Sequence, residues 1–233
     1  IPTCHLQVFT TSAEWMVSGA PLTPTSIQVN RQTQVGSNDT RSIPPIGIDG
    51  ATIFAAANGK EIREFLFSDL EGIYQATDLS LLAHHVINNP VEMAYDKYLR
   101  QAYIVMQDGN LSILTSFRSE DMQSWTHQKT DGKFISVALC QKQAYFIIQK
   151  ENTFYLEKFN EALHTDRGIL QTEATAKSTW GNLNVLENEE VQLVADGRVQ
   201  FPQKVESGQV TLEVPCKTLE TGIAFTHTIQ PLP

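Results

Sequence analysis

A hairpin-like unit recurs three times along this chain, and it constrains the fold more than any other feature. Each copy is an apolar run, a turn-forming pair and a second apolar-rich run. Placed in register, Gly59 falls on Gly109 at an offset of 50 residues, and Tyr103 falls on Tyr145 at an offset of 42. The three copies are Ala51–Phe67 (ATIFAAANGKEIREFLF), Gln101–Phe117 (QAYIVMQDGNLSILTSF) and Gln143–Phe159 (QAYFIIQKENTFYLEKF).

The centre of each copy predicts a tight turn. Asn58-Gly59 and Asp108-Gly109 lie between apolar runs, and Glu151-Asn152 is a weaker version of the same pattern. Asn-Gly and Asp-Gly are strong hairpin signals because both residues tolerate a positive φ. The repeat is therefore predicted to be a β-hairpin.

Further segments with strand-like sequences flank the hairpins. Val91–Asp96 precedes the second copy, Met122–Lys129 follows it, and Lys133–Cys140 precedes the third. Tyr103–Met106 and Tyr145–Ile148 are apolar at consecutive positions, which is typical of strands covered on both faces. Units of four strands that repeat every ~40–50 residues indicate a β-propeller. A two-sheet sandwich fits less well, because it does not predict the recurrence.

We therefore predict an all-β chain made of incomplete β-propeller-like blades with a short inserted helix, plus a small C-terminal β module. The propeller-like domain is predicted over 1–165, a connector over 166–182, and a small sandwich or barrel module over 183–233. The first domain holds units at 91–129 and 133–160, one with an altered outer strand, and the tail end of another near Leu6–Val17. Because propellers have four to eight blades, the missing blades are expected upstream of Ile1 or elsewhere in a longer polypeptide, or the sheets form an open arc.

Two segments interrupt the repeat. Residues 18–47 are rich in Pro, Ser, Thr and Gly, and predict a long loop of the kind that often serves an interface. Residues 77–88 predict a short helix, capped by Thr77 or Asp78 and ended by Asn88-Asn89-Pro90. Its inward-facing residues are predicted to be Leu79, Leu82 and Val86.

Composition and charge exclude several classes of protein. The formal net charge of −9 argues against a DNA clamp, whose affinity would come from clustered basic residues, but not against a surface that DNA slides past. No run approaches the ~18 apolar residues of a membrane helix, and no signal peptide is visible. Cys4, Cys140 and Cys216 are scattered, so buried free thiols are expected rather than disulfides or a zinc site.

No catalytic, cofactor-binding or metal-binding residue is predicted. The chain lacks the GxSxG, P-loop, GxGxxG and HExxH motifs. His84 and His85 are adjacent, and on a helix they would point about 100° apart, so they cannot chelate one metal from a single face. His127 is interpreted as a surface or interface residue.

The carboxylates and tryptophans are also given structural interpretations. Trp15, Trp125 and Trp180 lie at or near strand ends, where packing in the core or between blades is expected. The acidic residues are interpreted as a solvated strand edge (Glu61, Glu64, Asp69, Glu71) and as the charged start of a strand (Glu187, Glu189, Glu190). Enzymatic activity is therefore not predicted.

Several segments, taken together and in order, resemble the tail nozzle or stabilisation proteins of short-tailed bacteriophages and prophages, the tail tubular protein B-like family. The resemblance covers nearly the whole chain. The segments that carry it are FTTSAEWMVSGAPLTPTSIQVNRQTQVGS (9–37), GKEIREFLF (59–67), DLSLLAHHV (78–86), DGNLSILTSFRSEDMQSWTHQKTDGKFISVAL (108–139) and TGIAFTHTIQPLP (221–233).

This resemblance implies a structural virion component, part of the middle or C-terminal region of a nozzle subunit. It implies a six-fold ring that contacts other tail proteins such as the adaptor, is assembled in the cytoplasm of the bacterial host, and lets DNA pass without specific binding. It carries no catalytic residue to transfer. The first alternative from the residues is a propeller-like module that binds a host-surface glycan or a protein. The second, less favoured, is a glycan hydrolase, whose mark would be a cleft with two opposed carboxylates, one with a raised pKa.

Overall fold

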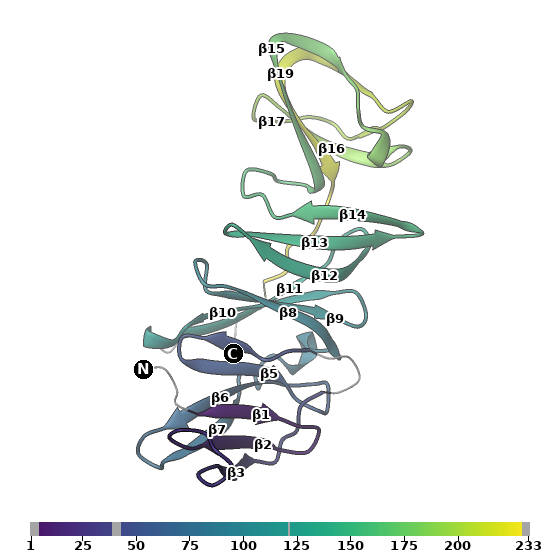
Figure 1. Cartoon of the computed structure of the whole chain (residues 1–233). Helices are drawn as coiled ribbons and strands as arrows, with labels where there is room; N and C mark the ends of the chain where they lie inside the picture. The colour runs from purple at the N-terminus through teal and green to yellow at the C-terminus, as the bar shows by residue number, and fades with distance from the viewer. Residues whose placement is uncertain (1–4, 39–42, 121, 230–233) are drawn as a thin grey trace. The chain divides into compact units, whose positions relative to one another are not determined.

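The computed structural model describes residues 5–38, 43–120 and 122–229, and in them the chain is nearly all β. The chain divides into two compact units, one of residues 1–158 and one of residues 159–233 (Figure 1). The predicted boundary near 165 was thus seven residues too late. No helix among the described residues is long and apolar enough to cross a membrane.

The first unit is a series of four antiparallel sheets taken in chain order. The first sheet consists of β1 (Leu6–Phe9), β2 (Glu14–Ser18) and β3 (Gln28–Thr33). The second consists of β4 (Ile46–Ile48), β5 (Ala51–Ala55), β6 (Ile62–Ser68) and β7 (Ile73–Asp78). The third consists of β8 (Pro90–Asp96), β9 (Gln101–Met106), β10 (Leu111–Phe117) and β11 (Met122–Gln128). The fourth consists of β12 (Lys133–Cys140), β13 (Gln143–Lys150) and β14 (Thr153–Lys158).

These sheets confirm the predicted blades. Each strand pairs with its neighbour in sequence, so every sheet is an up-and-down meander. The unit predicted at 91–129 has its four strands, whereas the unit predicted at 133–160 has three. The chain enters the second unit at Phe159, directly after β14, instead of adding an outer strand to this sheet.

The strand β9 packs on both faces, as its consecutive apolar residues predicted, whereas β13 packs on one face only, because Tyr145 and Ile147 are half-buried. Along β9, Ile104 and Met106 belong to a cluster with Ile53 of the preceding sheet. Tyr103 belongs to a different cluster, together with Phe146 of the following sheet. Successive residues of a strand point to opposite faces, so one strand serves two sheet–sheet seams.

The hairpin glycines connect each blade to the next one. Gly59 and Gly109 have positive φ values of 66° and 90°. The Gly59 carbonyl accepts a 2.8 Å hydrogen bond from the backbone N–H of Asn89, and the Gly109 carbonyl accepts one of 2.8 Å from Phe134. A Cβ on Gly109 would lie 2.6 Å from the Cβ of Lys133. Glycine is therefore required for the close approach of the next sheet as well as for the turn.

The turns differ in one detail from the prediction. In both Gly turns only the glycine has a positive φ, and its N–H donates to the carbonyl three residues earlier, at 3.0 Å. This is a turn followed by a glycine bulge, rather than a two-residue loop with two positive φ values. In the third hairpin Glu151 has the positive φ, 52°.

The predicted loop at 18–47 is wrong for much of its length. Gln28–Thr33 forms β3, Ser37 bridges to Ala56, and Ile46–Ile48 forms β4; residues 39–42 lie outside the described residues. β3 is polar and largely exposed, so it carries no apolar alternation. Pairing with β2 makes it a strand.

The predicted helix at 77–88 is reduced to one 3-10 turn, η1 (His84–Val86). Thr77 and Asp78 end β7, and a carboxylate oxygen of Asp78 accepts from the N–H of Ser80, a local bond that competes with helical hydrogen bonding. Leu79 and Val86 are buried as predicted, but Leu82 is exposed.

The second unit is the predicted C-terminal β module, and it is larger than expected. The predicted connector at 166–182 is wrong: Asp166–Trp180 forms the long strand β15. Trp180 is the one buried residue of β15, so the strand lacks the apolar alternation that would have marked it, and its pairing with β19 holds it in place. The sheet order is β15, β19, β16, β17, with β18 paired to β16. The remaining elements are η3 (Asn184–Leu186), β16 (Glu190–Ala195), β17 (Arg198–Val199), β18 (Gln203–Lys204) and β19 (Val210–Ile223).

Candidate functional site

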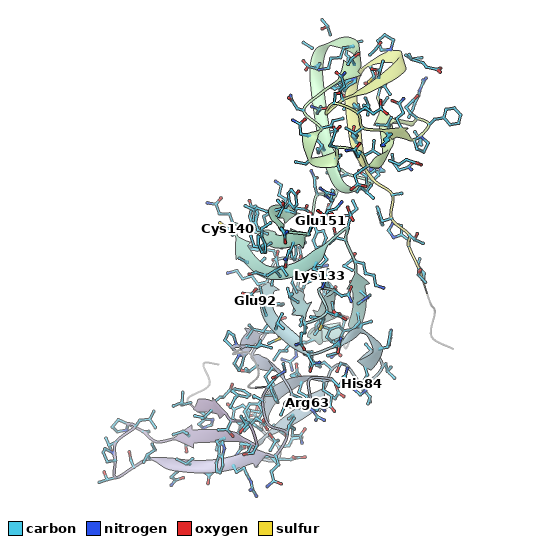
Figure 2. The ribbon with its side chains drawn as sticks, turned by 90° about the vertical axis from the view of Figure 1, so that its right-hand side faces the viewer. Arg63, His84, Glu92, Lys133, Cys140 and Glu151 are labelled. Carbon is cyan, nitrogen blue, oxygen red and sulfur yellow. The ribbon has the colours of Figure 1, made fainter. Side chains whose placement is uncertain are left out.

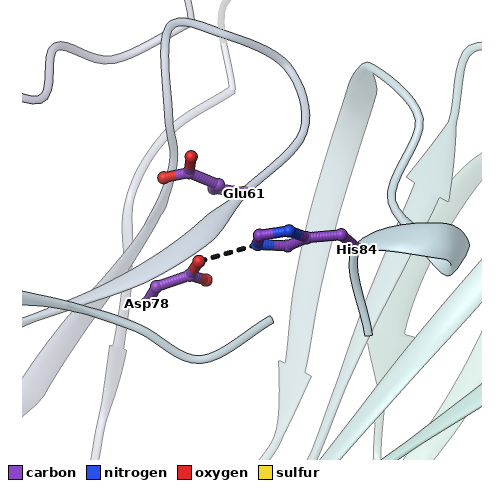
Figure 3. A group of neighbouring side chains, drawn as sticks. All are labelled: Glu61, Asp78 and His84. Atoms are coloured by element: carbon purple, nitrogen blue, oxygen red, sulfur yellow. Dashed lines mark hydrogen bonds and ion pairs between the residues drawn. The ribbon is translucent and has the colours of Figure 1, made fainter. Parts of the chain in front are cut away.

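Ionisable side chains gather where the second sheet of the first unit meets the third. His84 of η1 lies with its Nε2 atom 2.8 Å from Oδ2 of Asp78, the last residue of β7. Glu61, just before β6, lies beside them, and the ligand-type atoms of the three residues are within 4.8 Å of one another (Figure 3). Carboxylate and imidazole groups at this spacing are candidates for holding a metal ion.

The hydrogen bonds of this cluster favour a structural role. Asp78 Oδ1 accepts from the N–H of Ser80 at 2.8 Å and from its hydroxyl at 2.7 Å. Glu61 accepts from the Arg63 guanidinium at 2.7 Å and from the Asn58 amide at 2.7 Å. A metal ion would have to displace Arg63 and would be repelled by its charge. The cluster is best described as an ion-pair network that joins β6, β7 and η1.

Asp78 is the centre of that network, and its electrostatics are consistent with this role. Burial alone would raise the pKa of the Asp78 carboxyl, but hydrogen bonds from Ser80 and His84 outweigh it and hold the pKa below its ordinary value. The ionised form is therefore favoured in the folded protein.

We expect Asp78→Ala to destabilise the first unit by about 1–3 kcal/mol at pH 7, because the N–H and hydroxyl of Ser80 and the His84 ring lose their acceptor. Urea unfolding at several pH values measures the effect. A depressed carboxyl pKa contributes stability above its ordinary value, about 4, and this contribution is lost as pH falls through the folded-state value. The charge-dependent part of the difference between Asp78→Ala and the unmodified chain should therefore shrink below about pH 4. Asp69→Ala, in the exposed β6–β7 turn, is the control and should stay within about 0.5 kcal/mol.

Arg118 forms a second polar connection across the same seam. It lies in η2 (Arg118–Glu120), its Nε is 2.9 Å from Oε1 of Glu64, and its Nη1 donates to the carbonyl of Asp49 at 3.0 Å. Burial raises the pKa of Glu64, and the nearby Arg118 charge opposes this rise. The indole N–H of Trp125 donates to the Leu79 carbonyl at 2.9 Å. Arg118 and Trp125 therefore each donate to a backbone carbonyl next to a strand of the second sheet.

The next seam is connected in the same manner. Glu92 of β8, labelled in Figure 2, accepts a hydrogen bond. Its donor is the backbone N–H of Val137, at 2.9 Å, next to the bulge in β12. A β-bulge leaves a backbone N–H group without a partner in the neighbouring strand, and a carboxylate there can accept its hydrogen bond.

The second unit contains an open hollow of about 570 Å³ over β16 and β19. The Glu220 side chain lies at it, nearly fully buried, and Oε1 accepts from the N–H of His164 at 2.6 Å and from the hydroxyl of Thr165 at 2.8 Å. Phe225 and His227, whose rings are 4.6 Å apart, line another part of the hollow. The carboxylate anchors the loop before β15, and the lining is otherwise mainly apolar.

The residues singled out from the sequence take varied positions. Trp125 and Trp180 pack as predicted, in the seam and in the core of the second unit, and Trp15 is half-buried on β2. His127 lies largely exposed on the outer strand β11, as predicted. Partial burial of its ring, followed by the charge of Lys129, lowers its pKa. Glu61 and Glu64 correct the prediction of a solvated edge, since both are ion-paired, whereas Asp69 and Glu71 are exposed.

The remaining predictions are settled by local contacts. The acidic run at 187–190 leads into β16, which begins at Glu190 as predicted, whereas Glu187 accepts from the N–H groups of Ser207 and Gly208, at 3.0 and 2.6 Å. Cys216 is buried as expected, Cys140 is exposed against expectation, and Cys4 lies outside the described residues. Cys140 ends β12, where the chain turns back, so no further sheet residue covers it.

Sequence reasoning missed the Asp78–His84 contact and the role of Glu220. The Asp-x-Ser pattern at 78–80 is a signal for a local side-chain turn and could have marked the first. Glu220 pairs with a loop more than 50 residues away in the chain, so no local pattern marks it.

Comparisons with known proteins add little to the geometry. No known protein family matches the chain, and no curated protein is similar to it in sequence. Among solved structures, the chain is similar to an exo-β-1,3-galactanase from Phanerochaete chrysosporium crystallised with β-1,3-galactotriose, at 10% identity and a TM-score of 0.33, over 94% of this chain and 79% of that one. At this TM-score the likeness carries no functional argument.

Proposed function

We propose that this chain is a structural subunit of the tail nozzle of a short-tailed bacteriophage or prophage. It works through assembly rather than through chemistry. The ordered segments quoted above, which resemble that family, supply the biological context.

The observation that supports this proposal best is how the charged groups of the first unit are used. Glu92, Glu64, Arg118 and Asp78 each bind a backbone group or an opposite charge at or near a seam between sheets. An enzyme would need reactive groups held ready for a substrate, in a cleft. Side chains committed to joining sheets are typical of a scaffold.

In the proposed particle, six copies form a ring that extends the tail tube and contacts other tail proteins such as the adaptor. The subunit is made in the host cytoplasm and resides in the virion. The net charge of −9 would limit adhesion of passing DNA, because non-specific affinity comes from basic contacts to phosphates.

Electron microscopy of the purified chain, together with a DNA mobility-shift assay, tests this proposal. We expect ring-shaped particles with an axial opening, and no shift of duplex DNA at 50 mM salt with about 10 μM protein, since non-specific binders have dissociation constants of roughly 10⁻⁴–10⁻⁶ M even at physiological salt. Particles without an axial opening, or salt-sensitive DNA binding, would contradict it.

The hollow of the second unit favours one other function, that of a module binding a glycan or a protein. Phe225 offers an aromatic face beside it, and aromatic faces are common in binding sites. A glycan array probed with the chain tests this alternative: binding that Phe225→Ala abolishes would favour it over a purely structural role.

A further inference from the structure

The outward face of the fourth sheet is built like a buried seam. By the repeat, Tyr145 and Ile147 of β13 correspond to Tyr103 and Val105 of β9. Tyr103 and Val105 are 2% and 0% exposed, because the following sheet covers them. Tyr145 and Ile147 are only half-buried.

Exposed apolar residues lie beside these two side chains on β14, although Lys158 pairs with Tyr145 and Ser136 pairs with Ile147. Leu156 pairs directly with Ile147 across the β13–β14 ladder and is 69% exposed. Phe154, two residues away on the same face, is 60% exposed. The opposite face of this sheet carries Phe146, buried against the third sheet. The outward face therefore has the composition of a sheet–sheet contact.

The first sheet presents the complementary situation. Its inner face places Phe9 and Met16 against the second sheet. On the opposite face Leu6 and Val29 are each 55% exposed, while Val17, which lies between them in the ladder, is 6% exposed. Trp15 and Val8 pair on this face one step further along.

The two faces differ in sense. Each sheet of the first unit has one face that looks towards the next sheet in the chain and one that looks back towards the preceding sheet. In every seam, a face of the first kind packs against a face of the second kind. The outward face of β12–β14 is of the first kind and that of β1–β3 is of the second. Faces of these two kinds are the ones that pack together in each seam of the first unit.

We propose that a second copy of this chain docks the outward face of its β1–β3 sheet on the outward face of β12–β14, head to tail. The contact continues, between chains, the sheet–sheet contact that the first unit already makes three times. Trp15 and Tyr145 are the aromatic anchors on the two sides, a residue class enriched at interface hot spots.

The geometry of such a contact has two consequences. Two different patches meet, so the contact is heterologous and propagates into a ring or a filament. Three strands of about six residues cover roughly 14 by 20 Å, from strand spacings of about 4.8 Å and rises of about 3.3 Å. That is small for a stable dimer, so each contact is expected to be weak. This inference deepens the proposed function and rests on its self-assembly, but not on the phage assignment.

Sedimentation velocity from 5 to 300 μM, with two blocking variants, tests the arrangement. Leu156→Lys places a charge on one face, and Val29→Lys places one on the other. Each variant alone should associate more than tenfold more weakly than the unmodified chain. Mixed in equal amounts they should form dimers and nothing larger, because each retains the face that the other has lost. Leu70→Lys, at a fully exposed turn, is the control and should assemble like the unmodified chain.

Other outcomes overturn the inference. If Leu156→Lys and Val29→Lys still assemble like the unmodified chain, assembly uses another surface, and the proposed function stands while this inference fails. If the unmodified chain stays monomeric at 300 μM, the contact between copies does not exist, and another polypeptide segment covers these faces. Phe154→Lys and Leu6→Lys repeat the test, and circular dichroism confirms that each variant is folded.

Discussion

Trp180→Ala is expected to unfold the second unit at temperatures where the first unit remains folded. Trp180 is fully buried in the cluster formed with Leu193, Leu212 and Leu219. Removing a buried Trp side chain costs about 3–5 kcal/mol, through lost burial and the cavity left behind. That is a large part of the stability of a domain of this size, which is about 0.05–0.15 kcal/mol per residue.

Polar contacts of the indole add to the effect. Its N–H donates to the Lys177 carbonyl at 3.2 Å, and the Lys177 ammonium lies 4.4 Å from the ring centroid. Trp180→Phe keeps most of the buried apolar surface and loses these contacts, so it should cost about 1–2 kcal/mol.

Hydrogen exchange read by mass spectrometry separates the two units. Peptides from 190–223 should lose protection in Trp180→Ala, while peptides from 101–117 should keep it. Phe201→Ala is the matched control, because Phe201 is an aromatic residue of the same unit that is 91% exposed. Equal loss of protection in both units would show that they unfold together, contrary to the expectation.

Phe65→Ala is the second large effect that we expect, and it falls on the first unit. Phe65 is 1% exposed and stacks on Tyr74 with ring centroids 4.5 Å apart and planes 7° apart. Phe9 of the first sheet reaches it edge-on at 5.3 Å. The substitution should cost about 3–5 kcal/mol.

The loss should be greatest at the seam between the first two sheets. Amides of β1–β3 are expected to exchange faster than those of β8–β11, because Phe65 holds the first sheet through Phe9. Leu70→Ala, at a fully exposed position close by, should leave stability within about 0.5 kcal/mol. If the protection of β1–β3 were unchanged in Phe65→Ala, the aromatic cluster would not be what holds this sheet in place.

The hairpins and the strands they belong to could be predicted from the sequence because their signals are local. Gly59 and Gly109 need a positive φ, and the apolar run Tyr103–Met106 needs cover on both faces, whatever surrounds them. Their recurrence then indicated stacked blades. Trp180 and Trp125 were correctly expected to pack, since a large apolar ring is rarely left in water.

What only the tertiary structure decided is where polar and exposed segments go. β15 and β3 are strands because β19 and β2 supply ladder partners, and neither carries an apolar pattern of its own. Glu220 holds the loop at His164 and Thr165 because the fold brings β19 beside that loop, which no spacing along the chain specifies. Local sequence sets backbone preference and burial pattern, whereas a long-range hydrogen bond exists only once the fold has brought its two groups together.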